Sequence, residues 1–342
     1  MAGSTSVPFD VVGVPDFAGE KPLLFEARTL FFLGSWIERA GAAREFPLHL
    51  ACIGEPPDSV KWLSERAGAS ITVHEPKSIH GSRFDNKMRC FEVEGRTEHI
   101  LHVDMDVLMM GDPSPLGEMA GCVAAWPDGS SWVPNDVWRR ALEFLGVEVP
   151  AEEEAPEPGK KDAKPRPIVS FCNGGIFWAP WASGFSELWL DHMLRLEEFK
   201  ETLEEPYKSS REFAGDEVSL ATSVKACQAS GVPFKPLPVA FNTPWRAVAD
   251  GELDLDDVRL FHIFRLLKPL DGRRALAKAV WTDCKRATSH LFKQWGPLRY
   301  PASLLWFLPT TKKLRAFQGF LRLLHERHAL VALKHSGREG LF

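Results

Sequence analysis

The chain has 342 residues, a net charge of -5 and 44% hydrophobic residues, which is ordinary for a soluble globular protein with a sizeable core. This charge argues against a nucleic-acid-binding protein that relies on bulk electrostatics. No stretch reaches the roughly 18 apolar residues that span a bilayer, the start lacks a signal peptide, and six widely spaced cysteines fit a reducing compartment, so we expect a cytoplasmic protein.

The first 110 residues alternate short apolar strands with helices. We predict strands over 9–14, 47–54, 70–76 and 99–107, and helices over 25–41, 57–68 and 86–95. This alternation is typical of a parallel sheet with helices on both faces. Ligands of such sheets bind outside the carboxyl ends of the strands.

The remainder of the body predicts a mixed α/β continuation. We expect strands over 122–129, 170–180 and 258–264, and helices over 134–146, 186–200 and 216–227. Segment 149–167 contains five prolines and almost no large apolar residue. It is therefore interpreted as a flexible surface insertion.

The C-terminal residues 271–342 differ from the body in charge. They contain 14 Lys and Arg against 4 Asp and Glu, about +10, which leaves about -15 for residues 1–270. We divide the chain there into a body and a basic amphipathic helical extension. Within the extension, 285–334 mixes Lys and Arg with Phe, Leu and Trp, a pattern that can lie in the interface of an anionic bilayer. The alternative is helices that pack on the body and expose a basic face.

Two aspartates end the apolar stretch ILHVDMD. Because side chains alternate along a strand, Asp104 and Asp106 should point the same way, with Met105 opposite. Two carboxylates about 4 Å apart repel by on the order of 4 kcal/mol at an effective dielectric constant near 20. A divalent cation reverses the sign of this term, which indicates a metal site. The alternative is a strand end that reaches solvent, as we expect for the acidic turn at Asp254 and Asp256.

The stretch ILHVDMDVLMMGD resembles the Asp-x-Asp strand of GT-A glycosyltransferases, in particular glycosyltransferase family 8, which includes glycogenin and bacterial lipopolysaccharide sugar transferases. The resemblance extends over roughly 9–270 through DNKMRCF, FCNGGIF, AGDEVSLA and HIFRLLKPL, which follow in the family's order. It implies a GT-A fold, a Rossmann-like mixed sheet flanked by helices, followed here by the C-terminal helical extension. It also implies a glycosyltransferase.

The resemblance assigns a metal and a nucleotide-sugar donor, usually linked to UDP. Asp104, Asp106 and His262 match the family's ligands to Mn²⁺, for which Mg²⁺ can substitute, and Lys268 matches a lysine on the diphosphate. Carboxylate and imidazole donors suit this metal. Arg265 replaces a family glycine, and a buried histidine can otherwise be a satisfied core residue.

Other matched positions surround the donor sugar. Lys87, Asn173 and Gly175 match donor-binding positions, and Asp216 and Glu217 match an Asp-Gln pair beneath the anomeric carbon. The alternatives are an exposed helix lysine, a glycine bulge in a strand, and acids that favour a helix N-terminus. Glutamate in place of glutamine at position 217 is the main departure, because a second carboxylate can act as base or nucleophile.

We therefore predict a metal-dependent glycosyltransferase that moves a sugar, with retention, from a nucleotide-sugar donor to a glycan, lipid-linked or small-molecule acceptor. It would be cytoplasmic, with peripheral membrane contact through the C-terminal helices. One alternative is a sugar nucleotidyltransferase, whose glycine-rich basic first loop has only a faint counterpart at 13–22. The other is a GT-A-like binding protein without turnover.

Overall fold

The computed structural model describes residues 7–77, 83–128, 133–148, 153–155, 166–168, 171–205, 207–208, 215–243, 247–248 and 251–262. The predicted division at residue 270, the extension 271–342 and Lys268 lie outside these ranges. Within the described helices, none is long and apolar enough to cross a membrane.

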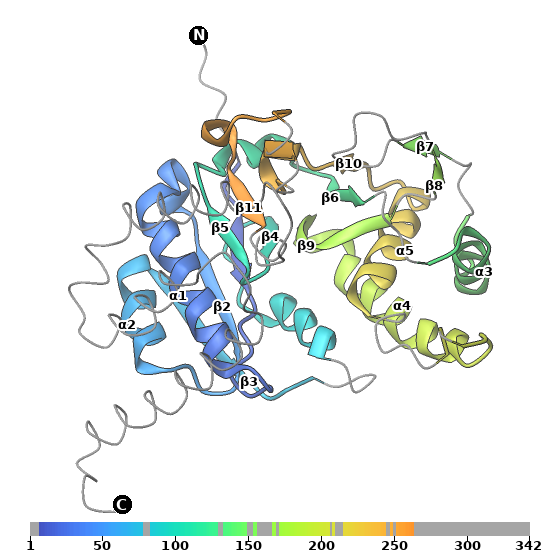
Figure 1. Cartoon of the computed structure of the whole chain (residues 1–342), viewed down its shortest axis with the longest axis horizontal. Helices are drawn as coiled ribbons and strands as arrows, with labels where there is room; N and C mark the ends of the chain where they lie inside the picture. Colours follow the sequence, from blue (N-terminus) through green and yellow to red (C-terminus); the bar gives the residue numbers. More distant parts are fainter. Residues whose placement is uncertain are drawn as a thin grey trace, which may run out of the picture.

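A seven-stranded mixed sheet with the order β10-β6-β9-β4-β1-β2-β3 forms the centre of the molecule (Figure 1). β9 is antiparallel to both β4 and β6, and the other neighbouring pairs are parallel. The strands are β1 (Asp10–Gly13), β2 (Leu48–Ile53), β3 (Ala69–His74), β4 (His99–Val103), β6 (Val123–Asp128), β9 (Phe171–Pro180) and β10 (Phe234–Pro236). The predicted mixed α/β class is confirmed; β10 was not expected.

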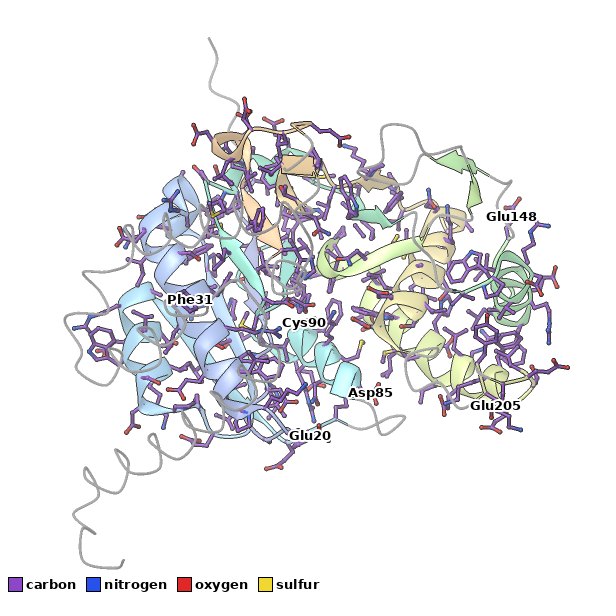
Figure 2. All side chains as sticks on the ribbon, in the orientation of Figure 1. Glu20, Phe31, Asp85, Cys90, Glu148 and Glu205 are labelled. Carbon is purple, nitrogen blue, oxygen red and sulfur yellow. The ribbon has the colours of Figure 1, made fainter. Side chains whose placement is uncertain are left out.

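The two faces of the sheet pack into two separate hydrophobic clusters. One contains residues of α1 (Pro22–Arg39) and α2 (Asp58–Ala67), and the other residues of α3 (Asn135–Leu145), α4 (Phe185–Lys200) and α5 (Asp216–Ala229). Adjacent Val11 and Val12 of β1 belong to opposite clusters, as the strand period requires. Phe31 on α1 and Cys90 also belong to opposite clusters; both side chains are labelled in Figure 2.

One helix differs from the expected type: the predicted helix over 86–95 is a 3-10 helix, η2 (Arg83–Glu92). Two short strands, β7 (Glu153–Ala155) and β8 (Arg166–Ile168), pair antiparallel. They lie in and beside the segment 149–167, whose predicted character as a flexible insertion stays a prediction because most of it lies outside the described residues.

A second, two-stranded sheet connects distant parts of the chain. β5 (Val107–Met109) pairs antiparallel with β11 (Leu260–His262), and His262 lies opposite Val107. The predicted strand over 99–107 is thus interrupted, because β4 ends at Val103 and β5 begins at Val107. This pairing places the last described residue beside the turn that contains the two aspartates.

Candidate active site

Asp104 and Asp106 lie in the turn between β4 and β5, where the backbone N–H of Val107 donates to the carbonyl of Asp104 at 3.1 Å. Met105, between them, is 3% exposed and belongs to the hydrophobic core. The two carboxylates therefore lie on the side away from the core, as predicted, although a turn and not a strand produces the alternation. By contrast, Asp254 and Asp256 are exposed around η6 (Leu255–Asp257), as expected for an acidic turn.

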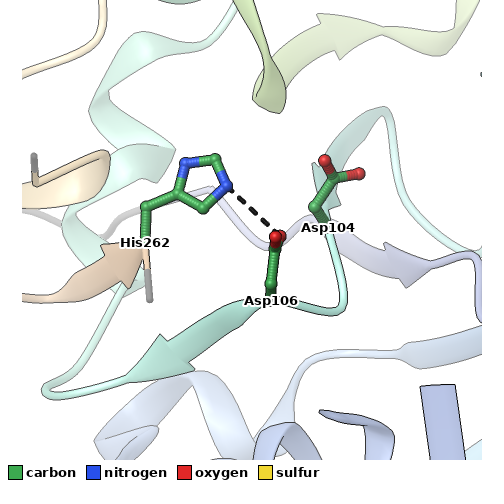
Figure 3. A group of neighbouring side chains, drawn as sticks. All are labelled: Asp104, Asp106 and His262. Carbon is green, nitrogen blue, oxygen red and sulfur yellow. Dashed lines mark hydrogen bonds and ion pairs between the residues drawn. The ribbon is translucent and has the colours of Figure 1, made fainter. Parts of the chain in front are cut away.

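His262 completes a cluster with these two aspartates (Figure 3). Its Nε2 lies 3.2 Å from Oδ1 of Asp106, and one ligand atom from each of Asp104, Asp106 and His262 lies within 4.8 Å of the others. Two carboxylates and an imidazole form a donor set that Mn²⁺ or Mg²⁺ accepts. The spacing and chemistry of these side chains therefore fit a divalent cation.

Each carboxylate of the pair also has a cationic neighbour. Lys87, on η2, places Nζ 3.1 Å from Oδ2 of Asp104 and donates to the carboxylate of Asp216 and, at 2.9 Å, to the carbonyl of Gly174. Arg28, on α1, places Nη2 3.5 Å from Oδ2 of Asp106. Within the described residues, the two negatively charged carboxylates of the site are therefore each in contact with a positively charged side chain.

These contacts set the protonation states. Burial alone would raise the pKa of Asp104, but Lys87 and then His102 hold it well below its usual range. Burial is likewise outweighed at Asp106, whose pKa is lowered by His262 and then Arg28. At His262, the nearby carboxylates outweigh burial and raise the pKa. Both aspartates are therefore ionised at neutral pH and available as ligands.

The first half of β9 approaches the same edge of the sheet because β9 is antiparallel to β4. The carbonyl of Gly175 accepts from the backbone N–H of Asp104 at 2.8 Å. Oδ1 of Asn173 accepts from the N–H of Gly175 at 3.0 Å and from Nδ2 of Asn242 at 3.2 Å. With its oxygen occupied in this way, Asn173 retains its NH₂ group as a donor.

The N-terminus of α5 contributes the acidic pair. Asp216, 8% exposed, is bound by Lys87, and Glu217 follows in the first turn of the helix. The turn is held by Ser219, which accepts from Trp189 Nε1 at 2.6 Å and donates to the carbonyl of Gly215 at 2.7 Å. Asp216 therefore does more than favour the helix N-terminus, which was the structural alternative for this residue.

The structure brings together eight of the nine predicted site residues, in the sense that they lie on adjacent elements at one edge of the sheet; Lys268 lies outside the described residues. Sequence reasoning missed three neighbours, Arg28, His102 and Asn242. His102 carried a usable signal, because it precedes Asp104 by two positions in a strand. For Arg28 and Asn242 we find no signal in the sequence.

A family model described as the Rhodobacterales glycosyltransferase domain matches residues 54–227, just over half of the chain. The chain belongs to this family. It is a glycosyltransferase, which confirms the predicted enzyme class over the nucleotidyltransferase and binding-protein alternatives. No curated protein matches the chain.

The chain is also similar to solved structures of other glycosyltransferases, of which LgtC supports the fold. The galactosyltransferase LgtC, in complex with donor and acceptor sugar analogues, is 14% identical, with 82% of this chain and 96% of that chain covered and a TM-score of 0.50. GlyE of Streptococcus pneumoniae is 12% identical, with 84% of this chain and 64% of GlyE covered and a TM-score of 0.42. Mouse xyloside xylosyltransferase 1 is 14% identical, with 75% of this chain and 97% of the mouse chain covered and a TM-score of 0.41. The expected GT-A fold is confirmed.

Proposed function

We propose that this glycosyltransferase depends on Mn²⁺ or Mg²⁺ and transfers a sugar from a UDP-sugar to a hydroxyl group. The observation that carries the proposal is the convergence of Asp104, Asp106 and His262 within 4.8 Å. Two carboxylates and an imidazole meet at the edge of the sheet where α/β folds bind ligands, and this set of oxygen and nitrogen donors suits a divalent cation.

The protein's own groups would bind and orient the donor. When bound, the cation supplies Lewis-acid stabilisation of the charge on the leaving diphosphate. Lys87 balances the charges of Asp104 and Asp216, and Asn173 offers its NH₂ group to a donor hydroxyl. Lys268 is proposed on the diphosphate from the family resemblance alone.

We further propose transfer with retention, so that an α-linked UDP-sugar gives an α-linked product. The leaving phosphate would take the acceptor proton on the face from which it departs, which requires no separate base. Asp216 and Glu217 would lie beneath the anomeric carbon, where a carboxylate favours positive charge. Proton NMR of the anomeric coupling in the product tests this prediction. A β-linked product would contradict it and would make Asp216 or Glu217 the candidate general base.

The acceptor and the location are also proposals. We propose a glycan, lipid-linked or small-molecule acceptor, a catalytic domain over 1–270, and peripheral membrane contact through 271–342. A cytoplasmic location is supported by Cys52, Cys90, Cys122, Cys172 and Cys227, all buried and unbridged.

The sharpest test of metal dependence exploits the two Asp-x-Asp triplets. We predict that Asp106→Asn removes turnover, by more than about a hundredfold, since even residues behind metal ligands can cost 10- to 100-fold. Asp256→Asn makes the same chemical change in an exposed turn and should leave turnover unchanged. Release of UDP from a panel of UDP-sugars with Mn²⁺ is the measurement, and circular dichroism confirms that both variants fold.

Metal removal gives the complementary result. Excess EDTA should abolish turnover, and added Mn²⁺ should restore it. Full activity in EDTA, or an active Asp106→Asn enzyme, would refute the metal-dependent mechanism while leaving the family assignment intact.

A further inference from the structure

His102 contacts Asp104, one of the three residues of the proposed metal site (Asp104, Asp106 and His262). It is a residue of β4, 0% exposed, and its Nε2 lies 3.1 Å from Oδ1 of Asp104. Its ring stacks on Phe177, its partner across the β4–β9 ladder, with ring centroids 4.9 Å apart and planes inclined by 23°. The imidazole is therefore fixed in position by a neighbour that has no hydrogen-bonding group.

The direction of this hydrogen bond follows from the partner. An ionised carboxylate can only accept, so Nε2 of His102 carries the hydrogen and Nδ1 does not. Nδ1 is buried, and no hydrogen-bond partner for it exists among the residues that the structure describes. A wholly apolar side chain would pack on Phe177 without burying an unsatisfied nitrogen, so packing does not account for an imidazole here.

The second oxygen of Asp104 has a different partner. Oδ2 lies 3.1 Å from Nζ of Lys87, so the two oxygens are held separately, one by each residue. Lys87 also binds Asp216 and the carbonyl of Gly174, whereas Asp104 is the one hydrogen-bond partner of the His102 ring in the described part of the chain. His102 is thus the contact dedicated to the orientation of Asp104.

We propose that His102 is a positioning residue, which donates from Nε2 to Asp104 and holds this carboxylate in the orientation that binds the cation. The inference rests on the proposed metal function. Hydrogen bonds to metal-ligating groups restrict their orientation, and their loss typically costs 10- to 100-fold in metal affinity.

The test measures the affinity for Mn²⁺ from the electron paramagnetic resonance signal of the free ion, with and without UDP. His102→Phe keeps an aromatic ring against Phe177 and removes the donor; His102→Leu is a second donor-free variant. Both should weaken Mn²⁺ binding 10- to 100-fold. His102→Gln, whose amide can donate from about the position of Nε2, should bind within about threefold of the unaltered protein.

His99 provides the matched control. It lies in the same strand, is 4% exposed, and stacks on Trp178 with centroids 5.0 Å apart, but its Nε2 accepts from the N–H of Gly121. His99→Phe therefore removes a stacked, buried imidazole without touching Asp104, and Mn²⁺ affinity should not change. Thermal unfolding of all variants checks that each is folded.

The possible outcomes distinguish a failure of the positioning role of His102 from a failure of the proposed metal site. Unchanged Mn²⁺ affinity in a folded His102→Phe or His102→Leu variant overturns the positioning role and leaves the metal site standing. A His102→Gln variant as weak as His102→Phe also overturns it, because the ring and not the donor would then matter. Absence of Mn²⁺ binding to the unaltered protein, with or without UDP, overturns the metal site and this inference together.

Discussion

Gly175 lies where β9 passes the cluster of Asp104, Asp106 and His262, and its missing side chain leaves room for His262. A Cβ atom at this position would lie 2.5 Å from Cε1 of that histidine, too close for the contact to be kept, and a tight 3.2 Å from its Nε2. The same backbone accepts the N–H of Asp104. At the scale of a residue, the geometry of the proposed metal site therefore depends on a glycine as well as on Asp104, Asp106 and His262.

We predict that Gly175→Ala displaces His262 and weakens Mn²⁺ binding by at least about tenfold, the range expected when a supporting contact of a metal ligand is lost. Gly146→Ala is the control, because Gly146 ends α3 at φ 73° with no atom near its Cβ position. It should cost about 1 kcal/mol of stability and no metal affinity. Calorimetric titration with Mn²⁺ decides; equal affinities in the two variants would contradict the steric argument.

At the scale of elements, α4 and α5 meet through buried polar groups as well as apolar ones. Nδ1 of His192 lies 2.9 Å from Oγ1 of Thr222 and 3.1 Å from Oγ of Ser223. One turn earlier, Trp189 binds Ser219 at the start of α5. Because α5 presents Asp216, this interface links the stability of a helix pair to the geometry of the site.

The His192 contact predicts a pH dependence of stability. Burial lowers the pKa of His192 from 6.5 to about 4. The unfolded chain therefore binds a proton first as the pH falls, and the folded state loses stability below about pH 6.5, by about 2 kcal/mol at pH 5. Urea unfolding at pH 7.5 and pH 5 should show a smaller loss for His192→Gln than for the unaltered protein.

The comparison of His192→Gln with the unaltered protein isolates the contribution of His192. His74, His99 and His102 also have lowered pKa values, because burial disfavours their charged forms, and they contribute equally to both proteins. An identical loss of stability in the two proteins would show that His192 does not titrate in this way.

At the scale of the molecule, charge is divided between an acidic body and a basic C-terminal segment. The difference, about -15 against about +10, follows from the sequence alone. We predict that the full chain binds vesicles containing phosphatidylserine at low salt and not vesicles of phosphatidylcholine, because basic residues near an anionic surface contribute about 1 kcal/mol each.

Substitution of Lys312, Lys313 and Arg315 by Gln should weaken vesicle binding by on the order of a hundredfold. Lys61, Arg66 and Lys208, all in the described body, supply a triple variant with the same loss of charge. It should bind vesicles almost normally. Vesicle flotation measures both variants; no flotation of the full chain at low salt, or equal losses in the two triples, would refute a membrane role for the segment.

Prediction from sequence succeeded where the signal is local. The order of strands and helices follows from residue periodicity, and the common direction of Asp104 and Asp106 from the alternation around Met105. The part played by His262 came only from family resemblance, since no local pattern relates it to Asp106. The contacts of Arg28 and Asn242 depend on how α1 and the chain after β10 pack, which periodicity does not encode.

The pairing of β5 with β11 has a consequence for folding. Asp106 and His262 are 156 positions apart, and a short ladder joins their segments. Closing so long a loop costs entropy that grows with the logarithm of its length, and three residue pairs recover little of it. Under the proposed function, a cation bound by both segments closes that loop as a crosslink. The cation would then stabilise the ladder itself, so that its removal loosens β11 before the central sheet.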